Sequence, residues 1–293
     1  MAERAKRSHH QAEALAAGLP PLLVAAERVA TTVSQGVHGR RRVGQGETFW
    51  QFRRYQAGDS IQRVDWRQSA KNDSVFIRET EWEAAQSVWL WRDASPSMSF
   101  TSGDMIEPKQ SRADLLLMAL ASLLIRGGEH VALLGTGVPP ASGRLVLSRL
   151  WNEIERARDT SQGLPPFEML PRHGRLVIFS DLLSPLDQVR MAVNAFAHYG
   201  VRGHVLQIVD PAEETFPYTG RIQFEGPEGE GTAVIGNVES VAGTYKNAFK
   251  AHLEGVRSIA TAAGWGYTRH RTDQAPEVAL MALYLALSDQ GRL

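Results

Sequence analysis

Residues 87–97 read Ser-Val-Trp-Leu-Trp-Arg-Asp-Ala-Ser-Pro-Ser, an apolar stretch that runs into a turn rich in side-chain oxygens. The apolar residues predict a short buried strand, and the turn begins at Asp93. Ser111 then has the residue type of a helix N-cap, and leucines recur after it at helical spacing as far as Gly127. A strand, a turn and an amphipathic helix in this order predict the start of a βαβ unit.

The same alternation continues to the C-terminus. We expect the later strands and helices at these ranges: strands at 130–135, 176–180, 205–209 and 266–271, and helices at 148–158, 184–199, 237–263 and 276–287. Residues 210–236 are rich in Gly, Pro and Glu and predict a loop with a hairpin around 222–224. Strands that alternate with helices predict an α/β fold: a doubly wound, mostly parallel sheet with helices on both faces.

We expect three parts along the chain. Residues 1–35 have apolar residues near helical spacing, interrupted at Pro20-Pro21, and predict a helical segment. Residues 36–86 are dense in Gly, aromatic residues and Arg, which favours a small β-rich insert of short strands and turns, with a strand at 75–80. Residues 87–293 form the α/β domain.

Composition excludes several classes of protein. The chain has 293 residues and a formal net charge of zero, which argues against nucleic acid as the main partner. It has no cysteine, so disulfides, thiolate metal sites and thiol nucleophiles are excluded. Its longest apolar run, 115–125, is too short to cross a bilayer, so we expect no transmembrane segment and a cytoplasmic protein.

Two acidic residues stand directly after predicted strands. Asp93 follows the strand at 87–91, and Asp181 follows the strand at 176–180. In an open α/β sheet, ligands bind beyond the carboxyl ends of the strands, where the strand order reverses. If these two strands are neighbours at that point, the two carboxylates face one crevice.

The turn after the first strand adds two hydroxyl groups. Asp93, Ser95 and Ser97 stand at alternate positions and can offer three hard oxygens to one point. Mg²⁺ and Mn²⁺ prefer such ligands. A site with only one or two carboxylates leaves a bound cation incompletely neutralised, so that it can accept a further carboxylate from a partner.

The motif Asp93-Ala-Ser-Pro-Ser97 resembles the metal-ion-dependent adhesion site of von Willebrand factor A domains. The resemblance implies a Rossmann-type sheet in which the Asp and both Ser bind a divalent cation. It also implies a Thr from a later loop, for which Thr136 is the candidate, and an Asp at the end of a later strand, which Asp181 matches.

A second stretch is similar to the domain-of-unknown-function 58 (DUF58) family. It comprises Gly44-Gln-Gly-Glu-Thr-Phe49, Arg53-Arg-Tyr55, Gly58-Asp59, Arg63-Val-Asp-Trp66 and Ser69-Ala70, and it runs directly into the Asp-x-Ser-x-Ser strand. Members of that family often occur with MoxR-type AAA+ ATPases. The resemblance therefore implies such an ATPase and a client protein as partners, in chaperone-like assembly or metal-cofactor maturation.

This stretch of the insert has a structural interpretation and a partner-contact interpretation. We expect its acids to pair with arginines through bidentate contacts and its tryptophan to be a buried anchor. A direct contact with a partner is the alternative. The residues concerned are Arg54, Tyr55, Asp59, Arg63, Asp65 and Trp66.

We expect a binding module and not an enzyme. Ser95 lacks the flanking glycines of a nucleophile elbow, and no histidine stands at a convincing strand end to act as its base. Two alternatives stay open. One is metal-assisted hydrolysis, for example of phosphodiesters, at Asp93 and Asp181. The other is a metal-independent scaffold with a degraded site.

Overall fold

The fold is taken from a computed structural model of the chain. The residues that the structure describes are 21–38, 49–55, 64–71, 74–80, 85–103, 105–157, 163–226 and 231–289. The chain divides into two compact units: one comprises Met1–Gly36 and Gln86–Leu293, and the other comprises Val37–Ala85.

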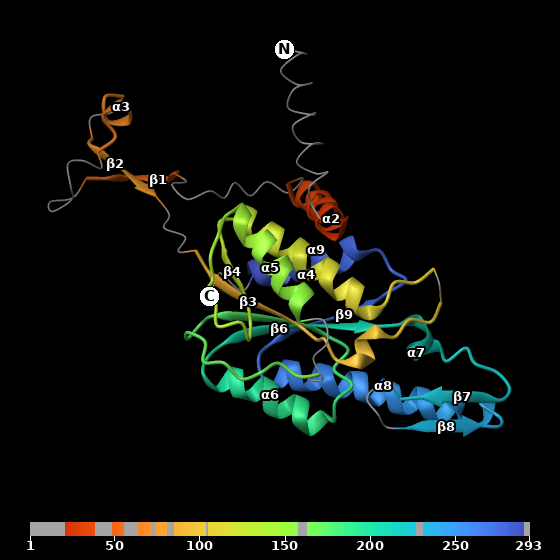
Figure 1. The fold of residues 1–293 in the computed structure, drawn as a ribbon. Coiled ribbons are helices and arrows are strands. Elements are labelled where there is room, and N and C mark those ends of the chain that lie inside the picture. Colours follow the sequence, from red (N-terminus) through yellow and green to blue (C-terminus); the bar gives the residue numbers. More distant parts are fainter. Residues whose placement is uncertain are drawn as a thin grey trace, which may run out of the picture. The chain divides into compact units, whose positions relative to one another are not determined.

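The larger unit is built on a five-stranded sheet in which all neighbouring strands are parallel, in the order β4-β3-β5-β6-β9 (Figure 1). The strands are β3 (Ser87–Arg92), β4 (His130–Leu133), β5 (Arg175–Ser180), β6 (Arg202–Val209) and β9 (Gly266–Arg271). Numbered along the chain, this is the order 2-1-3-4-5, which reverses direction between β3 and β5. The predicted α/β fold with a parallel sheet is confirmed.

Helices cover both faces of this sheet (Figure 1). One layer holds α4 (Lys109–Arg126), α5 (Arg144–Arg156) and α9 (Pro276–Asp289), and the other holds α6 (Leu186–His198) and α8 (Glu239–Ala262). Helix α2 (Pro21–His38) is attached to α4, because Glu27 accepts hydrogen bonds from Ser122 at 2.7 Å and from Arg126. No helix in the described part of the chain is long and apolar enough to cross a membrane.

Proline explains three of the helix starts that differ from the sequence prediction. Pro108 precedes α4, so Ser111 is the third residue of the helix and not its cap. Pro185, not Ser184, occupies the cap position of α6. Pro21 begins α2 and does not interrupt it. Proline lacks an N–H and has a fixed φ, so it fits at a helix start, where the N–H has no intrahelical partner.

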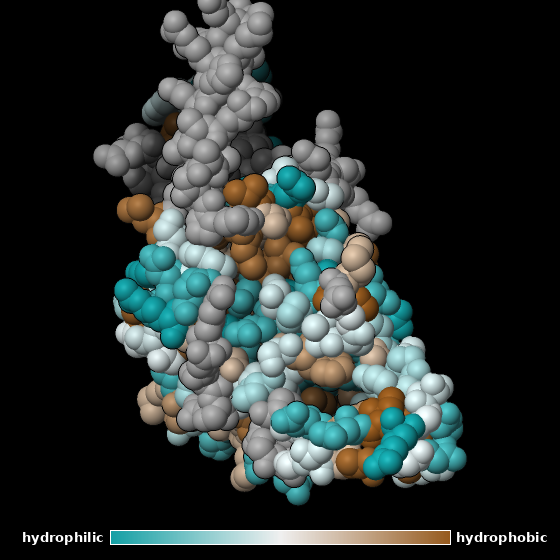
Figure 2. Space-filling view, turned by 45° about the vertical axis from the view of Figure 1, so that its right-hand side comes forward, coloured by the Kyte–Doolittle hydropathy of each residue, from teal (hydrophilic) through white to brown (hydrophobic). Residues whose placement is uncertain are grey.

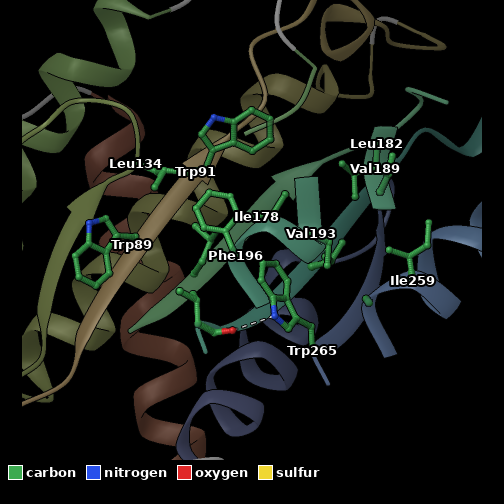
Figure 3. Packing of buried hydrophobic residues seen from close by; sticks show 14 of the residues in the cluster. Trp89, Trp91, Leu134, Ile178, Leu182, Val189, Val193, Phe196, Ile259 and Trp265 are labelled. Carbon is green, nitrogen blue, oxygen red and sulfur yellow. Dashed lines mark hydrogen bonds between the residues drawn. The ribbon is translucent and has the colours of Figure 1, made fainter. Parts of the chain in front are cut away.

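A cluster of buried hydrophobic residues lies between the sheet and the layer of α6 and α8 (Figure 3). Ile178 on β5 and Phe196 on α6 are almost completely buried in it. The indole of Trp265 donates a hydrogen bond to the carbonyl of Val201 at 3.2 Å and packs on Gly203, where an added Cβ would lie 2.0 Å from the ring. Glycine is therefore required at this point of β6. This packing fixes the position of the central strands whose ends form the site.

The connection between β6 and α8 carries a short helix and a hairpin. Helix α7 (Pro211–Thr215) starts directly after β6, and β7 (Ile222–Glu225) pairs antiparallel with β8 (Thr232–Ile235). The predicted hairpin is thus confirmed. Phe216, at the end of α7, stacks on Tyr245 of α8 with ring centroids 4.5 Å apart, which ties the connection to the helix.

The smaller unit contains a two-stranded antiparallel sheet of β1 (Phe49–Arg54) and β2 (Phe76–Thr80), with the single-turn helix α3 (Trp66–Ser69). The prediction of Trp66 as a buried anchor is wrong: it is the first residue of α3, and 64% of its surface is exposed. Among the described residues, no element covers the indole at this first-turn position of a short helix.

The carboxylate of Asp65 caps α3 and accepts a hydrogen bond from the Gln68 amide at 2.8 Å. Arg54 and Tyr55, at the end of β1, are both exposed. Asp59 and Arg63 lie outside the described residues, so the predicted ion pairs between acids and arginines stay a prediction.

Candidate functional site

Asp93 and Asp181 follow the two strands between which the sheet order reverses. Arg92, the last residue of β3, is aligned with Phe179 of β5, and the Asp93 amide donates to the Phe179 carbonyl at 2.9 Å. Both acids are buried, with 0% and 2% of their surfaces exposed. The structure therefore brings these two carboxylates together at the carboxyl edge of the sheet, where ligands of doubly wound folds bind.

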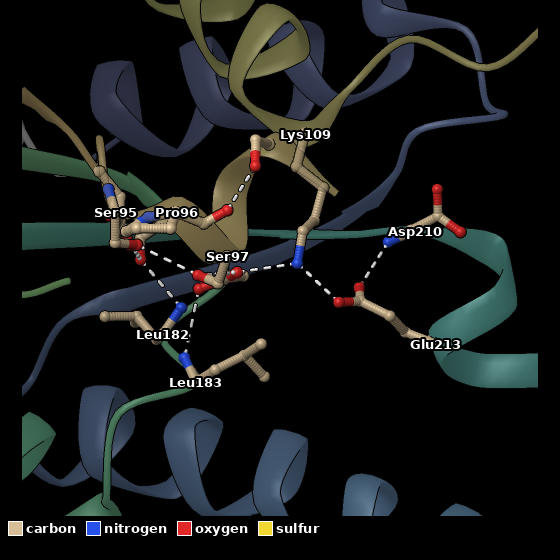
Figure 4. Close-up of polar contacts among 12 residues, drawn as sticks. Ser95, Pro96, Ser97, Lys109, Leu182, Leu183, Asp210 and Glu213 are labelled. Carbon is tan, nitrogen blue, oxygen red and sulfur yellow. Dashed lines mark hydrogen bonds and ion pairs between the residues drawn. The ribbon is translucent and has the colours of Figure 1, made fainter. Parts of the chain in front are cut away.

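The turn after β3 aims both serines at this edge (Figure 4). Ser95 precedes a short 3₁₀ helix, Pro96–Ser99, and its amide donates to Asp93 Oδ1 at 2.8 Å. The Ser97 hydroxyl donates to Asp181 Oδ2 at 2.8 Å, and the two serine oxygens are 3.1 Å apart. A continuous chain of oxygens thus joins the turn to the end of β5.

Two further residues hold the carboxyl edge in place. The Ser180 hydroxyl donates to Asp93 Oδ2 at 2.6 Å and accepts from the Leu182 amide at 2.8 Å. The Gln207 side chain on β6 donates to the Asp181 carbonyl at 2.7 Å. Sequence reasoning missed both, although Ser180 is the last residue of a predicted strand and adjoins a candidate ligand.

The structure also places an unpredicted lysine at this edge. Lys109 begins α4, is completely buried, and donates to Asp181 Oδ2 at 2.8 Å and to Glu213 Oε1 at 2.6 Å (Figure 4). Glu213 lies in α7, where it forms a capping box with Asp210. The pattern Asp210-Pro-Ala-Glu213 after a strand could have indicated this element, because β6 ends at the same edge of the sheet.

The surroundings of Asp93 disfavour the ionised form of its carboxyl group. Burial and the nearby charge of Asp181 raise the pKa of the Asp93 carboxyl from 3.8 to about 6, although hydrogen bonds from Ser180 and Ser95 oppose the shift. Burial would lower the pKa of Lys109, but the charges of Asp181 and Glu213 outweigh it and hold that pKa above its usual value. The lysine is therefore a permanent cation at neutral pH.

Thr136 makes its contacts inside its own turn. It follows β4, its hydroxyl donates to the Leu133 carbonyl at 2.9 Å, and it accepts from the Val138 amide at 3.4 Å. Gly163 lies close to the site, since an added Cβ there would lie 3.7 Å from Ser95 Oγ. The role of Thr136 as a ligand stays a prediction.

The donor atoms at this edge fit a hard divalent cation. Two carboxylates and two hydroxyls are available from Asp93, Asp181, Ser95 and Ser97, and all four residues are buried. Across the residues that the structure describes, no group of three or more His, Cys, Asp and Glu is arranged to hold a metal ion. Any cation held here would therefore depend on hydroxyl ligands, a donor set suited to Mg²⁺ or Mn²⁺ and not to zinc.

A family model described as "Protein of unknown function DUF58" matches residues 51–255, which is more than half of the chain. The chain belongs to the DUF58 family. The match includes most of β1 and all of β2 in the smaller unit, the Asp-x-Ser-x-Ser turn, and the carboxyl edge as far as α8. The family resemblance noted from the sequence is thus confirmed.

Several proteins are similar to this DUF58 chain over most of its length. Uncharacterized proteins from Mycobacterium tuberculosis and Mycobacterium bovis are 24% identical over 275 residues, which cover 89% of this chain and 86% of theirs.

Two solved structures are also similar. One is the conserved hypothetical protein BatB from Bacteroides thetaiotaomicron, at 16% identity and a TM-score of 0.42. The other is an aerotolerance-related membrane protein from Bacteroides fragilis, at 18% identity and a TM-score of 0.43. Each similarity covers 70% of this DUF58 chain and all of the other chain.

Proposed function

We propose that this DUF58 protein is a non-catalytic protein-binding module whose binding depends on a divalent cation, Mg²⁺ or Mn²⁺. Asp93, Ser95 and Ser97 would hold the cation in the manner of a von Willebrand factor A domain, with Asp181 beside them. The observation that carries the proposal is the convergence of these four side chains at the point where the strand order reverses.

The incomplete coordination of the site favours a carboxylate from a partner. Asp93 and Asp181 are the two acids of the ligand set, and Asp181 already accepts from Lys109 at 2.8 Å. The side-chain oxygens of Asp93, Ser95, Ser97 and Asp181 leave coordination positions of a divalent cation open, and a carboxylate from a partner would fill one of them. Oxygen ligands and incomplete protein coordination are typical of Mg²⁺ sites.

The surface next to the site suits contact with a protein. Phe100, which follows the 3₁₀ helix, is 36% exposed, and Leu183, whose amide donates to Asp181, is 41% exposed. Figure 2 shows hydrophobic patches between hydrophilic residues on the face that it displays. Apolar contacts around a charged centre are a common composition for protein interfaces.

The hydrogen bonding of the serines favours binding over catalysis. Ser97 donates its proton to a carboxylate, and within the described residues neither Ser95 nor Ser97 is hydrogen-bonded to a histidine. A serine nucleophile needs a base that can take its proton. The alternative function is metal-assisted hydrolysis, and an assay for phosphodiester hydrolysis by the purified protein tests it.

Family membership suggests the partner. We propose a MoxR-type AAA+ ATPase, together with a client protein that the pair assembles or matures. The test is capture of the MoxR-type ATPase from the same genome by the tagged protein, in Mg²⁺ and in EDTA. We expect capture by the wild type in Mg²⁺, and none in EDTA or by Asp93→Asn.

Asp187→Asn is the matched control, because Asp187 is an exposed acid in the first turn of α6. This variant should capture the ATPase as the wild type does. Equal capture in EDTA, or by Asp93→Asn, would contradict cation-dependent binding and favour the alternative of a metal-independent scaffold. Sustained phosphodiester hydrolysis that Asp93→Asn abolishes would replace the binding role with an enzymatic one.

A further inference from the structure

Lys109 is the one completely buried lysine among the described residues, and it touches the proposed cation site directly. Its ammonium group lies between Asp181 Oδ2 at 2.8 Å and Glu213 Oε1 at 2.6 Å. It also lies 5.8 Å from the centre of the Phe100 ring. Neither the Asp-x-Ser-x-Ser motif nor the binding role proposed above accounts for a buried cation at this place.

The position of Lys109 in its helix makes the ammonium group unusual. It is the first residue of α4, where the unpaired amides of the helix create a partial positive charge. A cation is electrostatically unfavourable at a helix N-terminus. The two carboxylates, from β5 and α7, therefore hold the side chain there, and removal of either would leave a buried charge poorly compensated.

The hydrogen positions around Asp181 follow from the donor inventory. Asp181 Oδ2 accepts both the Ser97 hydroxyl proton and a proton of Lys109. Since the single Ser97 proton is used there, Ser95 is the donor in the contact between the two serines. A chain of directed hydrogen bonds thus runs from Ser95 to Ser97 to Asp181, and Lys109 is a second donor to the carboxylate at its end.

The ammonium group compensates the negative charge of Asp181, as a bound divalent cation would. It also orders the side chain, and it repels a second cation placed beside the same carboxylate. From this geometry we propose that Lys109 is an affinity-determining residue of the cation site: an internal counter-ion that orders the Asp181 carboxylate and weakens the binding of divalent cations. This inference rests on the proposed cation site.

The test compares Mn²⁺ binding by wild type, Lys109→Met and the double variant Lys109→Met/Glu213→Gln. Methionine keeps much of the apolar length of lysine without its charge. The double variant removes one positive and one negative charge, so that the net charge of the site stays that of the wild type. Lys250→Met is the control, because Lys250 is exposed on α8.

We expect Lys109→Met to bind Mn²⁺ at least about tenfold more tightly than the wild type in a calorimetric titration, because the repulsion is removed. Its Tm should also rise more on Mn²⁺ addition than that of the wild type, since the cation replaces the missing counter-ion. The double variant should also bind Mn²⁺ more tightly than the wild type. Lys250→Met should behave as the wild type in both measurements.

The outcomes separate this inference from the proposed function. Binding by the wild type with equal or weaker binding by Lys109→Met overturns the role of Lys109 and leaves the cation site intact. If only Lys109→Met binds Mn²⁺, the role of Lys109 as a counter-ion is supported, and the proposal that the wild type functions with a bound cation is overturned. No binding by any of the variants overturns both. If Lys109→Met does not fold even with Mn²⁺, the Mn²⁺ affinity of the double variant is compared with that of the wild type, and the same outcomes apply.

Discussion

Replacing Asp93 by Asn should stabilise the cation-free protein at neutral pH, although the residue is at the centre of the proposed site. Burial and the charge of Asp181 raise the pKa of Asp93 from 3.8 to about 6. The native state therefore binds this proton more tightly than the unfolded chain does, so stability falls as pH rises through this window. The two pKa values correspond to a cost of about 3 kcal/mol above about pH 6.

Asparagine removes the charge and keeps most of the geometry. Its carbonyl can still accept from the Ser95 amide, as Asp93 Oδ1 does at 2.8 Å. Its amide faces Ser180, whose hydroxyl now donates to Asp93 Oδ2 and must turn away. This rearrangement costs about 1 kcal/mol. The expected net gain for Asp93→Asn is therefore about 2 kcal/mol at about pH 8.

Urea unfolding of both proteins in EDTA, measured from about pH 4.5 to 8, checks this. The difference between the two curves should open as pH rises towards about 6 and stay constant above it, because only the wild type ionises at this position. Asp187→Asn should show no such difference. An Asp93→Asn protein less stable than the wild type at about pH 8, or a difference independent of pH, would refute the reasoning.

Three further predictions follow from particular contacts. Gly203→Ala should lower the free energy of unfolding by at least about 2 kcal/mol in urea titrations, because its Cβ would overlap the tryptophan ring that packs on it. Gly243→Ala, with open space around it inside α8, should be neutral or stabilising. Asp114→Asn should cost about 3 kcal/mol in the same assay, because it leaves the guanidinium of Arg92 buried without the carboxylate 2.9 Å away; a cost below about 1 kcal/mol would contradict this. Ser97→Ala should fold with a near-normal Tm and bind Mn²⁺ about tenfold more weakly, and unchanged affinity would exclude the hydroxyl as a ligand.

Local patterns were sufficient to predict the sheet. Continuous apolar runs such as Leu176–Phe179 predict buried parallel strands, and the structure has β5 there. The placement of Asp93 and Asp181 needed only one further condition, that β3 and β5 are neighbours, and the strand order fulfils it. Both residues could therefore be found from strand ends alone.

Residues that act through long-range contacts could not be predicted in this way. Lys109 is the first residue of an amphipathic helix, where a lysine is usually solvated, and its partners are 72 and 104 residues away along the chain. The prediction that Trp66 is buried was wrong because no long-range contact within the described part of the chain covers it. Its aromatic character indicated burial, but the single turn of α3 provides no surface to cover it. A sequence pattern predicts on which face of its own helix or strand a side chain lies. It does not predict which other helix or strand packs against that face.

The most direct test of the proposed cation site is a titration of the protein with Mn²⁺ at about pH 8, where Asp93 is ionised, followed by the loss of the signal of free Mn²⁺ in electron paramagnetic resonance. The wild type and Asp187→Asn should each remove one Mn²⁺ per chain, and Mg²⁺ should compete for it. Asp93→Asn should remove none. Absence of binding by the wild type, or equal binding by Asp93→Asn, would contradict a cation site between β3 and β5.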